Sequence, residues 1–469
     1  MFFENLERFG ENVAIIENGE KVTYSQLQKS VKDLSGLYPE RNLAFLVCSN
    51  STESVEIYLS LLQARIPVAL INGHLDQEHF QALLETYHPY YLWSPKDYSA
   101  FEEASEYGKY RLSIFEENRE GGEKISSDLG VLLTTSGSTG SPKLVRQSYK
   151  NIQANTSSIV EYLGITSSDV AITTLPMHYT YGLSVLQTHI AAGASIVMTE
   201  DSIMQPTFWK QLADHHVTTF AGVPYTYEML KKLRFLRRDV SSLRYLTQAG
   251  GKLGKDLHYE MATSCKEKGI DFIVMYGQTE ATARMSYVPA ESAVEKAGSI
   301  GIAIPGGKLW VIDVDGNVIE TPNTPGELLY QGENVTMGYA TCKEDLEKGY
   351  EQGDILHTGD VAQFDEDGFF YVVGRLKRFL KLYGNRVNLD EVEGILKHEG
   401  IECVITGIDD NMKICLLNEA DKEKTNAIIT GSTTIPRFAY KVYVIDEIPR
   451  NDSGKIQYNV LNEMLEEKK

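Results

Sequence analysis

The densest group of polar side chains lies at residues 134–143, Thr-Thr-Ser-Gly-Ser-Thr-Gly-Ser-Pro-Lys. Glycines let backbone amides approach an anion, the hydroxyls donate hydrogen bonds, and the ammonium of Lys143 neutralises negative charge. The segment is not a Walker loop, because Lys143 follows a proline and is not followed by Ser or Thr. It is therefore either a phosphate-binding loop after the apolar run 130–133 or a flexible surface loop.

A second polar segment, residues 276–280, reads Tyr-Gly-Gln-Thr-Glu and follows the apolar run 272–274. An aromatic ring, a hydroxyl and a carboxylate at the end of a strand can hold a base, a phosphate and Mg²⁺ together. Taken alone, such a segment is more often an ordinary polar loop. Its position after a predicted strand makes it a candidate nucleotide site.

Three charged residues further along the chain add to these candidates. An aspartate such as Asp360 can accept two hydrogen bonds from ribose hydroxyls, and Arg375 offers a fork of donors. The alternative is an ordinary ion pair between the two. Lys455 stands in the segment 449–456, Pro-Arg-Asn-Asp-Ser-Gly-Lys-Ile, where a lysine in a glycine turn is usually solvated.

The elements that must position these residues follow one pattern in the first half of the chain. Short apolar runs alternate there with helical stretches, which predicts parallel α/β layers with helices on the faces. The predicted strands are 43–48, 68–72, 170–174, 195–199 and 218–221, and the predicted helices are 53–64, 208–215 and 225–236.

The pattern changes after about residue 298. The segments 308–319 and 362–373 each contain an Asp-Gly turn and are predicted to be antiparallel hairpins. Four cations follow within residues 375–381, and then the chain has an α+β pattern of its own, which places a domain boundary at 375–378. The alternative for this cation-dense segment is the solvated end of a strand. The predicted domains are 1–375 and 376–469. In the second, a helix is expected at 389–398 and strands at 404–407, 413–417 and 439–445.

The composition restricts the classes of function. The 469 residues carry 45 Lys and Arg against 65 Asp and Glu, and the net charge of −20 argues against nucleic-acid binding. No stretch approaches the roughly 20 apolar residues that span a bilayer, and the first residues lack the pattern of a secretion signal. The five cysteines have no CxxC spacing, so we expect reduced, buried thiols in a cytoplasmic protein.

Taken in order, the motif segments resemble those of the adenylate-forming superfamily, which comprises acyl-CoA synthetases, adenylation domains of peptide synthetases and luciferases. The resemblance covers nearly the whole chain, from about residue 12 to Lys455. Each motif is moderately specific, whereas the ordered set is highly specific. The resemblance implies an α/β fold, with two α/β subdomains and a β-rich, distorted-barrel part in the large domain and a small, mobile α+β domain at the C-terminus.

The resemblance also implies roles for the motif residues. Thr279 and the catalytic Lys455 would contact the α-phosphate, and Glu280 would bind Mg²⁺. Lys377 corresponds to the hinge, and Gly384 to the tunnel for the thiol. The implied ATP-binding residues are Thr135, Ser136, Gly137, Ser138, Thr139, Gly140, Lys143, Gly250, Gly251, Lys252, Tyr276, Gly277, Gln278, Asp360 and Arg375.

The implied reaction has two steps. A carboxylic acid attacks the α-phosphorus of ATP to give acyl-AMP and pyrophosphate, with Mg²⁺ present. The small domain then rotates, and the acyl group passes to the thiol of CoA or of a carrier protein's phosphopantetheine. Two positions depart from the family's pattern, since Leu144 stands where Gly is usual and Tyr458 where an Arg is usual.

The acyl pocket is expected near residues 176–182, Pro-Met-His-Tyr-Thr-Tyr-Gly. This segment has no aspartate for an α-ammonium, so ordinary carboxylic acids are favoured over amino acids. Arg284 is a candidate partner for a second acid group of the substrate, although we favour a surface ion pair. Such a pocket suits a short, aryl or hydroxylated acid. The alternative is that its aromatic residues are ordinary core residues. The expected pocket residues are His178, Tyr179, Tyr181, Gly182 and Tyr225.

Two other functions stay open. One is transfer of the acyl group from acyl-AMP to an amine or a hydroxyl. The other is a non-catalytic scaffold that binds ATP without pyrophosphate exchange, which the joint retention of the charged motif residues disfavours. The expected partners are a small carboxylic acid and, as one alternative, an acyl carrier protein, with no nucleic acid or membrane.

Overall fold

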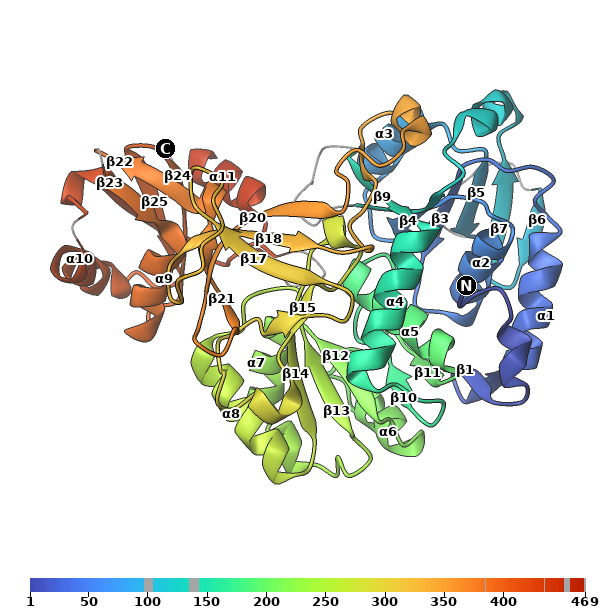
Figure 1. The fold of residues 1–469 in the computed structure, drawn as a ribbon, viewed down its shortest axis with the longest axis horizontal. Coiled ribbons are helices and arrows are strands. Elements are labelled where there is room, and N and C mark those ends of the chain that lie inside the picture. Colours follow the sequence, from blue (N-terminus) through green and yellow to red (C-terminus); the bar gives the residue numbers. More distant parts are fainter. Residues whose placement is uncertain (97–103, 135–142, 384, 434, 451–455, 468–469) are drawn as a thin grey trace. The chain divides into compact units, whose positions relative to one another are not determined.

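The computed structural model describes residues 1–96, 104–134, 143–383, 385–433, 435–450 and 456–467. The chain divides into two compact units, one of residues 1–308 with 331–356 and one of residues 309–330 with 357–469. The predicted α/β fold class is confirmed, because strands and helices alternate through the first unit (Figure 1). The division into a large domain of residues 1–375 and a mobile lid of residues 376–469 stays a prediction.

The first sheet of the first unit has a parallel centre. Its strands lie in the order β16-β15-β14-β13-β12-β10-β11-β1-β2. Neighbours from β14 to β1 are parallel, whereas β15, β16 and β2 pair antiparallel. The strands are β1 (Val13–Glu17), β2 (Glu20–Thr23), β10 (Val170–Ile172), β11 (Ser195–Met198), β12 (Thr219–Gly222), β13 (Tyr245–Gln248), β14 (Asp271–Tyr276), β15 (Ser286–Tyr287) and β16 (Ile302–Ala303).

The second sheet has the order β19-β9-β8-β4-β3-β5-β7-β6. Strands β8, β4, β3 and β5 are parallel, and the outer strands pair antiparallel. The strands are β3 (Ala44–Cys48), β4 (Val68–Asn72), β5 (Tyr91–Pro95), β6 (Ser105–Tyr107), β7 (Tyr110–Ile114), β8 (Leu129–Thr134), β9 (Leu144–Ser148) and β19 (Gly338–Ala340).

The helices of the first unit begin at identifiable caps. Thr23 and Ser148 form capping boxes with Gln26 and Asn151, and two other helices carry proline in the first turn. Side chains of α1, α2, α4 and α5 join those of β3, β4, β8 and β11 in one buried core. The helices are α1 (Tyr24–Ser35), α2 (Thr52–Gln63), α3 (Gln77–Tyr87), α4 (Tyr149–Leu163), α5 (Thr180–Ala192), α6 (Pro206–Asp214), α7 (Pro224–Lys232) and α8 (Lys255–Glu267).

The second unit contains a sheet in the order β17-β18-β20-β21. The hairpin predicted at 362–373 is confirmed, because β20 pairs antiparallel with β21. The hairpin predicted at 308–319 is confirmed only in part. The sheet neighbour of β17 is β18, and the second half of the predicted hairpin pairs with β17 through the single bridge Ile312–Val318. The strands are β17 (Lys308–Ile312), β18 (Gly326–Gln331), β20 (Ile355–Phe364) and β21 (Phe370–Arg375).

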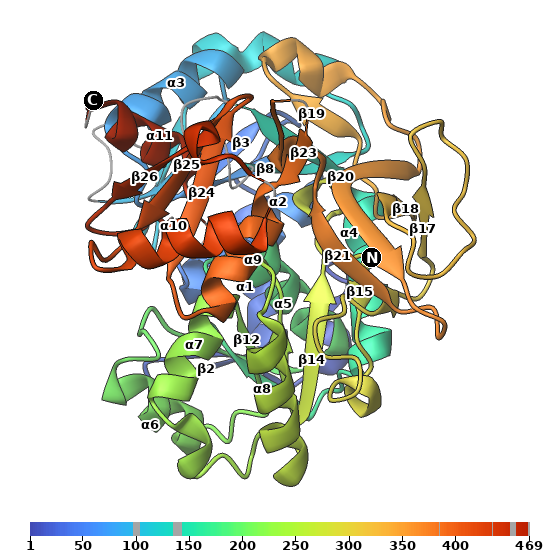
Figure 2. The ribbon, with the colours of Figure 1, turned by 90° about the vertical axis from the view of Figure 1, so that its left-hand side faces the viewer.

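The rest of the second unit matches the predicted α+β pattern (Figure 2). The helix predicted at 389–398 is confirmed with both ends correct, and it packs against β24. The elements are β22 (Phe379–Leu382), β23 (Asn385–Asn388), α9 (Leu389–His398), β24 (Cys403–Ile408), β25 (Asn411–Leu416), α10 (Asp421–Ser432), β26 (Tyr440–Val444) and α11 (Tyr458–Glu467).

None of the five cysteines, all of which lie in the described ranges, forms a disulfide, and four of them are buried, as expected for small core residues. Burial raises the pKa of the Cys265 thiol to about 12, which keeps it unreactive. Within the described ranges, no helix has the length and apolarity needed to cross a membrane.

Candidate active site

The predicted site residues of the first unit follow the parallel strands of the first sheet. Strand β10 leads into 176–182, β12 into Tyr225, β13 into 250–252, and β14 into 276–280. The carboxyl ends of parallel strands meet at one edge of a sheet, where α/β proteins bind ligands. The fold therefore brings four separate predicted segments to one edge (Figure 1).

The loop after β14 is tightly turned. A Cβ added at Gly277 would lie 1.9 Å from the carbonyl oxygen of Ala283, so the position admits only glycine. Thr282 has φ 64° and ψ −66°, and the amide of Ala283 donates to the carbonyl of Ala281 at 2.7 Å. This is the strained form of the γ-turn, and such strain concentrates at functional sites. No local sequence signal predicted this turn at Thr282, because threonine is not a typical residue for positive φ.

Hydrogen bonds from other elements hold this strained turn in place. The Thr282 hydroxyl donates to the carbonyl of Asn334 at 2.7 Å. The Asn334 amide donates to the carbonyls of Ala281 and Arg284, each at 2.9 Å. Gln147, on β9, donates to the carbonyl of Thr282 at 3.2 Å. The loop that carries Thr279 and Glu280 is therefore pre-organised.

Tyr339, on β19, connects two of the predicted site residues. Its hydroxyl donates to Oε1 of Glu280 at 2.7 Å, and Nζ of Lys143 lies 3.3 Å from its ring centroid. Burial, and then the negative charge of Glu280, raise the pKa of Tyr339, so the phenol stays protonated and donates. Tyr339 was not predicted from the sequence, because it lies 59 residues from Glu280 and in no motif.

A buried arginine positions Tyr339. Arg146, on β9, is fully buried and donates to the carbonyls of Tyr339 and Met337, each at 3.0 Å. It also forms an ion pair with Glu351. Since β9 begins directly after Lys143, the same strand fixes both the lysine and the backbone that carries the tyrosine.

The segment after β13 lies against the predicted acyl-pocket segment. Gly250 has φ +82°, and a Cβ there would lie 2.4 Å from the hydroxyl oxygen of Tyr179. The amide of Gln248 donates to the carbonyls of Ala249 and Gly251, at 3.1 and 3.0 Å. In the loop after β14, Gln278 donates to the hydroxyl of Tyr276 at 3.2 Å. Lys252 has an exposed side chain.

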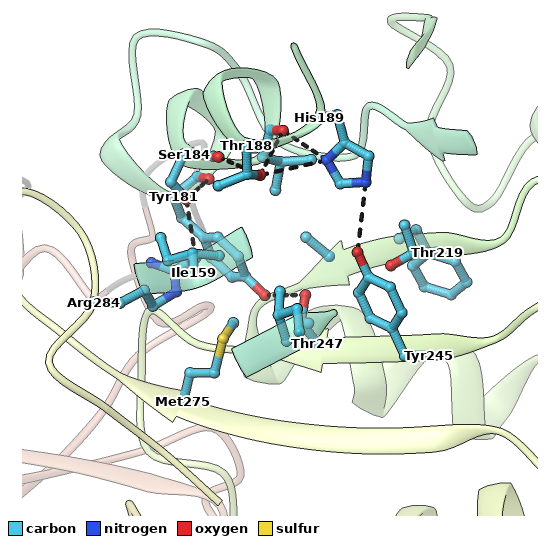
Figure 3. A pocket seen from close by; sticks show the side chains of 14 residues that line it. Ile159, Tyr181, Ser184, Thr188, His189, Thr219, Tyr245, Thr247, Met275 and Arg284 are labelled. Atoms are coloured by element: carbon cyan, nitrogen blue, oxygen red, sulfur yellow. Dashed lines mark hydrogen bonds between the residues drawn. The ribbon is translucent and has the colours of Figure 1, made fainter. Parts of the chain in front are cut away.

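A small cavity of about 20 Å³ lies between α4, α5 and the first sheet (Figure 3). Tyr181 lines it and donates a hydrogen bond to Thr247 at 2.9 Å. Gly182 lines a second cavity, beside Met177. His178 and Tyr179 line neither of these two cavities, and Tyr225 is 47% exposed. The five predicted acyl-pocket residues therefore occupy different surroundings.

Arg284 also lines the first cavity (Figure 3). Arg284 is buried, with only 3% of its surface exposed to solvent. The surface ion pair that we favoured for it is therefore wrong: the strained turn at Thr282 directs the chain back into the core.

In the second unit, Asp360 and Arg375 lie opposite each other on β20 and β21. Nε of Arg375 donates to Oδ1 of Asp360 at 2.9 Å, and Asp360 is buried while the Arg375 side chain is 64% exposed. The ion pair considered from the sequence is thus present. The pair places the exposed guanidinium of Arg375 beside the buried carboxylate of Asp360.

The chain matches the family model described as "AMP-binding enzyme" over residues 2–340. It belongs to this family. The resemblance drawn from the ordered motifs is confirmed, and the chain is an adenylate-forming enzyme.

Relatives of this AMP-binding enzyme match along most of its length. The 2-succinylbenzoate–CoA ligase of Bacillus pumilus is 27% identical over 467 residues, covering 95% of this chain and 94% of the relative. The oxalate–CoA ligase of Arabidopsis thaliana is 26% identical over 459 residues, covering 90% and 88%. The solved structure of O-succinylbenzoate coenzyme A synthetase from Bacillus subtilis with AMP has a TM-score of 0.79, 24% identity and coverage of 98% and 97%. The last likeness supports the fold.

Several predicted site residues of this AMP-binding enzyme lie outside the described residues. For Lys377 the structure describes the backbone alone, in the turn 376–378. The predicted residues outside the described ranges are Thr135, Ser136, Gly137, Ser138, Thr139, Gly140, Gly384 and Lys455.

Proposed function

We propose that this enzyme uses ATP to activate a carboxylic acid as acyl-AMP, releasing pyrophosphate, and then transfers the acyl group to a phosphopantetheine thiol. The observation that carries the proposal is the array formed by Lys143, Tyr339 and Glu280. One ring has a lysine ammonium 3.3 Å from its centroid and a carboxylate oxygen 2.7 Å from its hydroxyl. A cation for phosphate and a carboxylate suited to a metal ion thus share one anchor.

The residues around Glu280 fit a magnesium ion. Oε1 of Glu280 is held by Tyr339, which leaves the other oxygen for a ligand. In the part of the chain that the structure describes, no group of three or more His, Cys, Asp or Glu could hold a metal ion. Mg²⁺ commonly binds through one carboxylate plus substrate phosphates, so Glu280 alone suffices on the protein side. When bound, the ion would neutralise phosphate charge.

We assign the β- and γ-phosphates of ATP to the loop 135–143, ending at Lys143. Thr279 would donate to the α-phosphate from the pre-organised loop after β14. Phosphoryl transfer depends mainly on positioning and on electrostatic stabilisation, and the bonds that fix Thr282 and Asn334 supply such rigidity. The segment 250–252 and Tyr276 would contact the adenine.

The second unit would contribute three further roles. Asp360 would accept hydrogen bonds from the ribose hydroxyls, with Arg375 adding donors from its exposed face. Lys455 would bridge the substrate carboxylate and the α-phosphate during adenylation. We propose that residues 376–469 then move about Lys377, so that Lys455 leaves and the segment around Gly384 admits the thiol.

Relatives named as CoA ligases support a thiol acceptor and a small acid. The acids in the names of these relatives include 2-succinylbenzoate, oxalate and 4-coumarate. We propose CoA or a carrier protein's phosphopantetheine as the acceptor, since both present the same thiol. Because none of the five described cysteines forms a disulfide and four of them are buried, we propose a reducing, cytoplasmic location.

Trapping experiments test the proposal. Incubation with MgATP, a panel of carboxylic acids and hydroxylamine should yield a hydroxamate, which reports acyl-AMP. Replacing hydroxylamine with CoA, a phosphopantetheinylated carrier, an amine or an alcohol then identifies the acceptor. Thioester formation is the expected result. Binding of ATP without any hydroxamate would contradict the proposal and favour a non-catalytic scaffold, and transfer only to an amine or alcohol would contradict the thiol step.

A further inference from the structure

The cavity beside Tyr181 contains one charged side chain, that of Arg284 (Figure 3). The rest of its lining is neutral: hydroxyl side chains, aromatic and aliphatic residues, Met275 and His189. Burial lowers the pKa of His189 to about 4, so this imidazole is uncharged at neutral pH. The cavity therefore holds a positive charge with no anionic side chain in its lining.

The guanidinium of Arg284 is poorly satisfied by the protein. Nη1 donates to the carbonyl of Ala283 at 3.2 Å, and Nη2 donates to the hydroxyl of Ser184 at 3.3 Å. Nε is buried without a hydrogen-bond partner. No carboxylate pairs with this arginine among the described residues. Its carbon Cζ lies 3.9 Å from the ring centroid of Tyr181.

The hydrogen bonds of the Arg284 main chain do not explain why this residue is an arginine. Its amide donates to Asn155 at 3.1 Å, and its carbonyl accepts from Asn155 and Asn334, each at 2.9 Å. Any residue other than proline would make these bonds. A buried charge without an anionic partner is costly in a folded protein, and a carboxylate is the group that best satisfies a guanidinium.

We propose that Arg284 binds a second carboxylate of the acid that is activated, so that the substrate is a small dicarboxylic acid. This inference rests on the proposed function and names its substrate class. Arg284 lies four residues after Glu280 on the same pre-organised loop. A carboxylate held there leaves the other end of a short acid for the reaction with ATP. The small cavity volume, about 20 Å³, suits a compact group.

A substrate comparison with the unmodified enzyme tests the proposal first. Pyrophosphate exchange is measured with oxalate, malonate, succinate and glutarate, with the monomethyl ester of each, and with matched monoacids. We expect kcat/KM for the best dicarboxylate to exceed that of its monoester by roughly 30-fold or more, the usual effect of losing one partner of a buried charge pair. Equal or better activity with monoesters or monoacids would overturn the proposal while leaving acid activation intact. Exchange with none of these acids, nor with any other carboxylic acid, would instead defeat the proposed function.

Variants then assign the preference to the residue. Arg284→Gln should lose the preference for the dicarboxylate through a higher KM for the acid, with the KM for ATP unchanged. Arg284→Lys should retain part of the preference for the dicarboxylate. Arg238→Gln is the matched control, because Arg238 also lies over an aromatic ring, 4.8 Å from the centroid of Trp209, but outside the cavity. A purely structural Arg284 would lower activity with diacids and monoacids alike, which would contradict the assignment.

Discussion

Tyr339 donates a hydrogen bond of 2.7 Å to Glu280, although the two residues lie 59 positions apart. The bond fixes one oxygen of the carboxylate that we assign to Mg²⁺. The same ring faces Nζ of Lys143, so one side chain orients a metal-binding anion and a phosphate-binding cation. The finding gives Tyr339 a positioning role.

Tyr339→Phe separates the two contacts of this residue. The variant keeps the ring that faces Lys143 but removes the hydroxyl that holds Glu280. A hydrogen bond to a charged group contributes about 1.5–3 kcal/mol, so we expect a loss of roughly 10-fold or more in kcat/KM for MgATP. The Mg²⁺ concentration for half-maximal activity should rise. An unchanged Mg²⁺ dependence would contradict the positioning role, and Tyr339→Leu should lose more because both contacts go.

Gly277→Ala tests whether the turn after β14 must be this tight. The added Cβ would lie 1.9 Å from the carbonyl oxygen of Ala283, so the loop that carries Thr279 must shift. We expect a loss of at least 100-fold in exchange activity, since small misplacements of reacting groups have effects of this order. Gly349→Ala is the control, because a Cβ there meets nothing within 4 Å. Equal activities of the two variants would refute the requirement.

His258 should make folding stability depend on pH. Burial lowers its pKa from 6.5 to about 4 in the folded protein, where Nδ1 accepts from the amide of Gly298 at 3.0 Å. Between these values the unfolded chain binds more protons, so the free energy of unfolding falls as the pH drops from 6.5 towards 4. His258→Asn keeps an acceptor but does not titrate. Denaturant unfolding from pH 7 to 4 should show a shallower slope for the variant, and identical slopes would contradict the assignment.

Lys455→Ala tests the proposed division of labour between the two half-reactions. Removing a donor that stabilises developing charge typically costs about 10²–10³ in rate. Adenylation should fall by this amount, whereas thioester formation from added acyl-AMP should persist. Equal loss of both half-reactions would contradict the two-state assignment for residues 376–469.

The local patterns of the sequence predicted much of the fold. The helix 389–398 and the strand 68–72 were predicted with both ends correct, because capping residues and apolar runs are local signals. The return strand expected near Val318 is a single bridge, because β18, not adjacent in sequence, is the sheet neighbour of β17. Long-range pairing overrides a turn signal at such places.

The candidate site was predictable only as far as its motifs extend. The segments 250–252 and 276–280 were identified in the sequence and lie at one edge of the sheet. Tyr339 and the strain at Thr282 depend on tertiary contacts between β19, β9 and the loop after β14, which no sequence window contains. The burial of Arg284 was missed for the same reason: its surroundings come from α4 and α5.

Pyrophosphate exchange into ATP tests the central claim most directly. The enzyme is mixed with MgATP and labelled pyrophosphate, with and without each acid of the panel. The proposed reaction predicts that label enters ATP only when a suitable carboxylic acid is present. Label that enters ATP equally without acid, or with no carboxylic acid at all despite ATP binding, would contradict activation of a carboxylic acid as acyl-AMP.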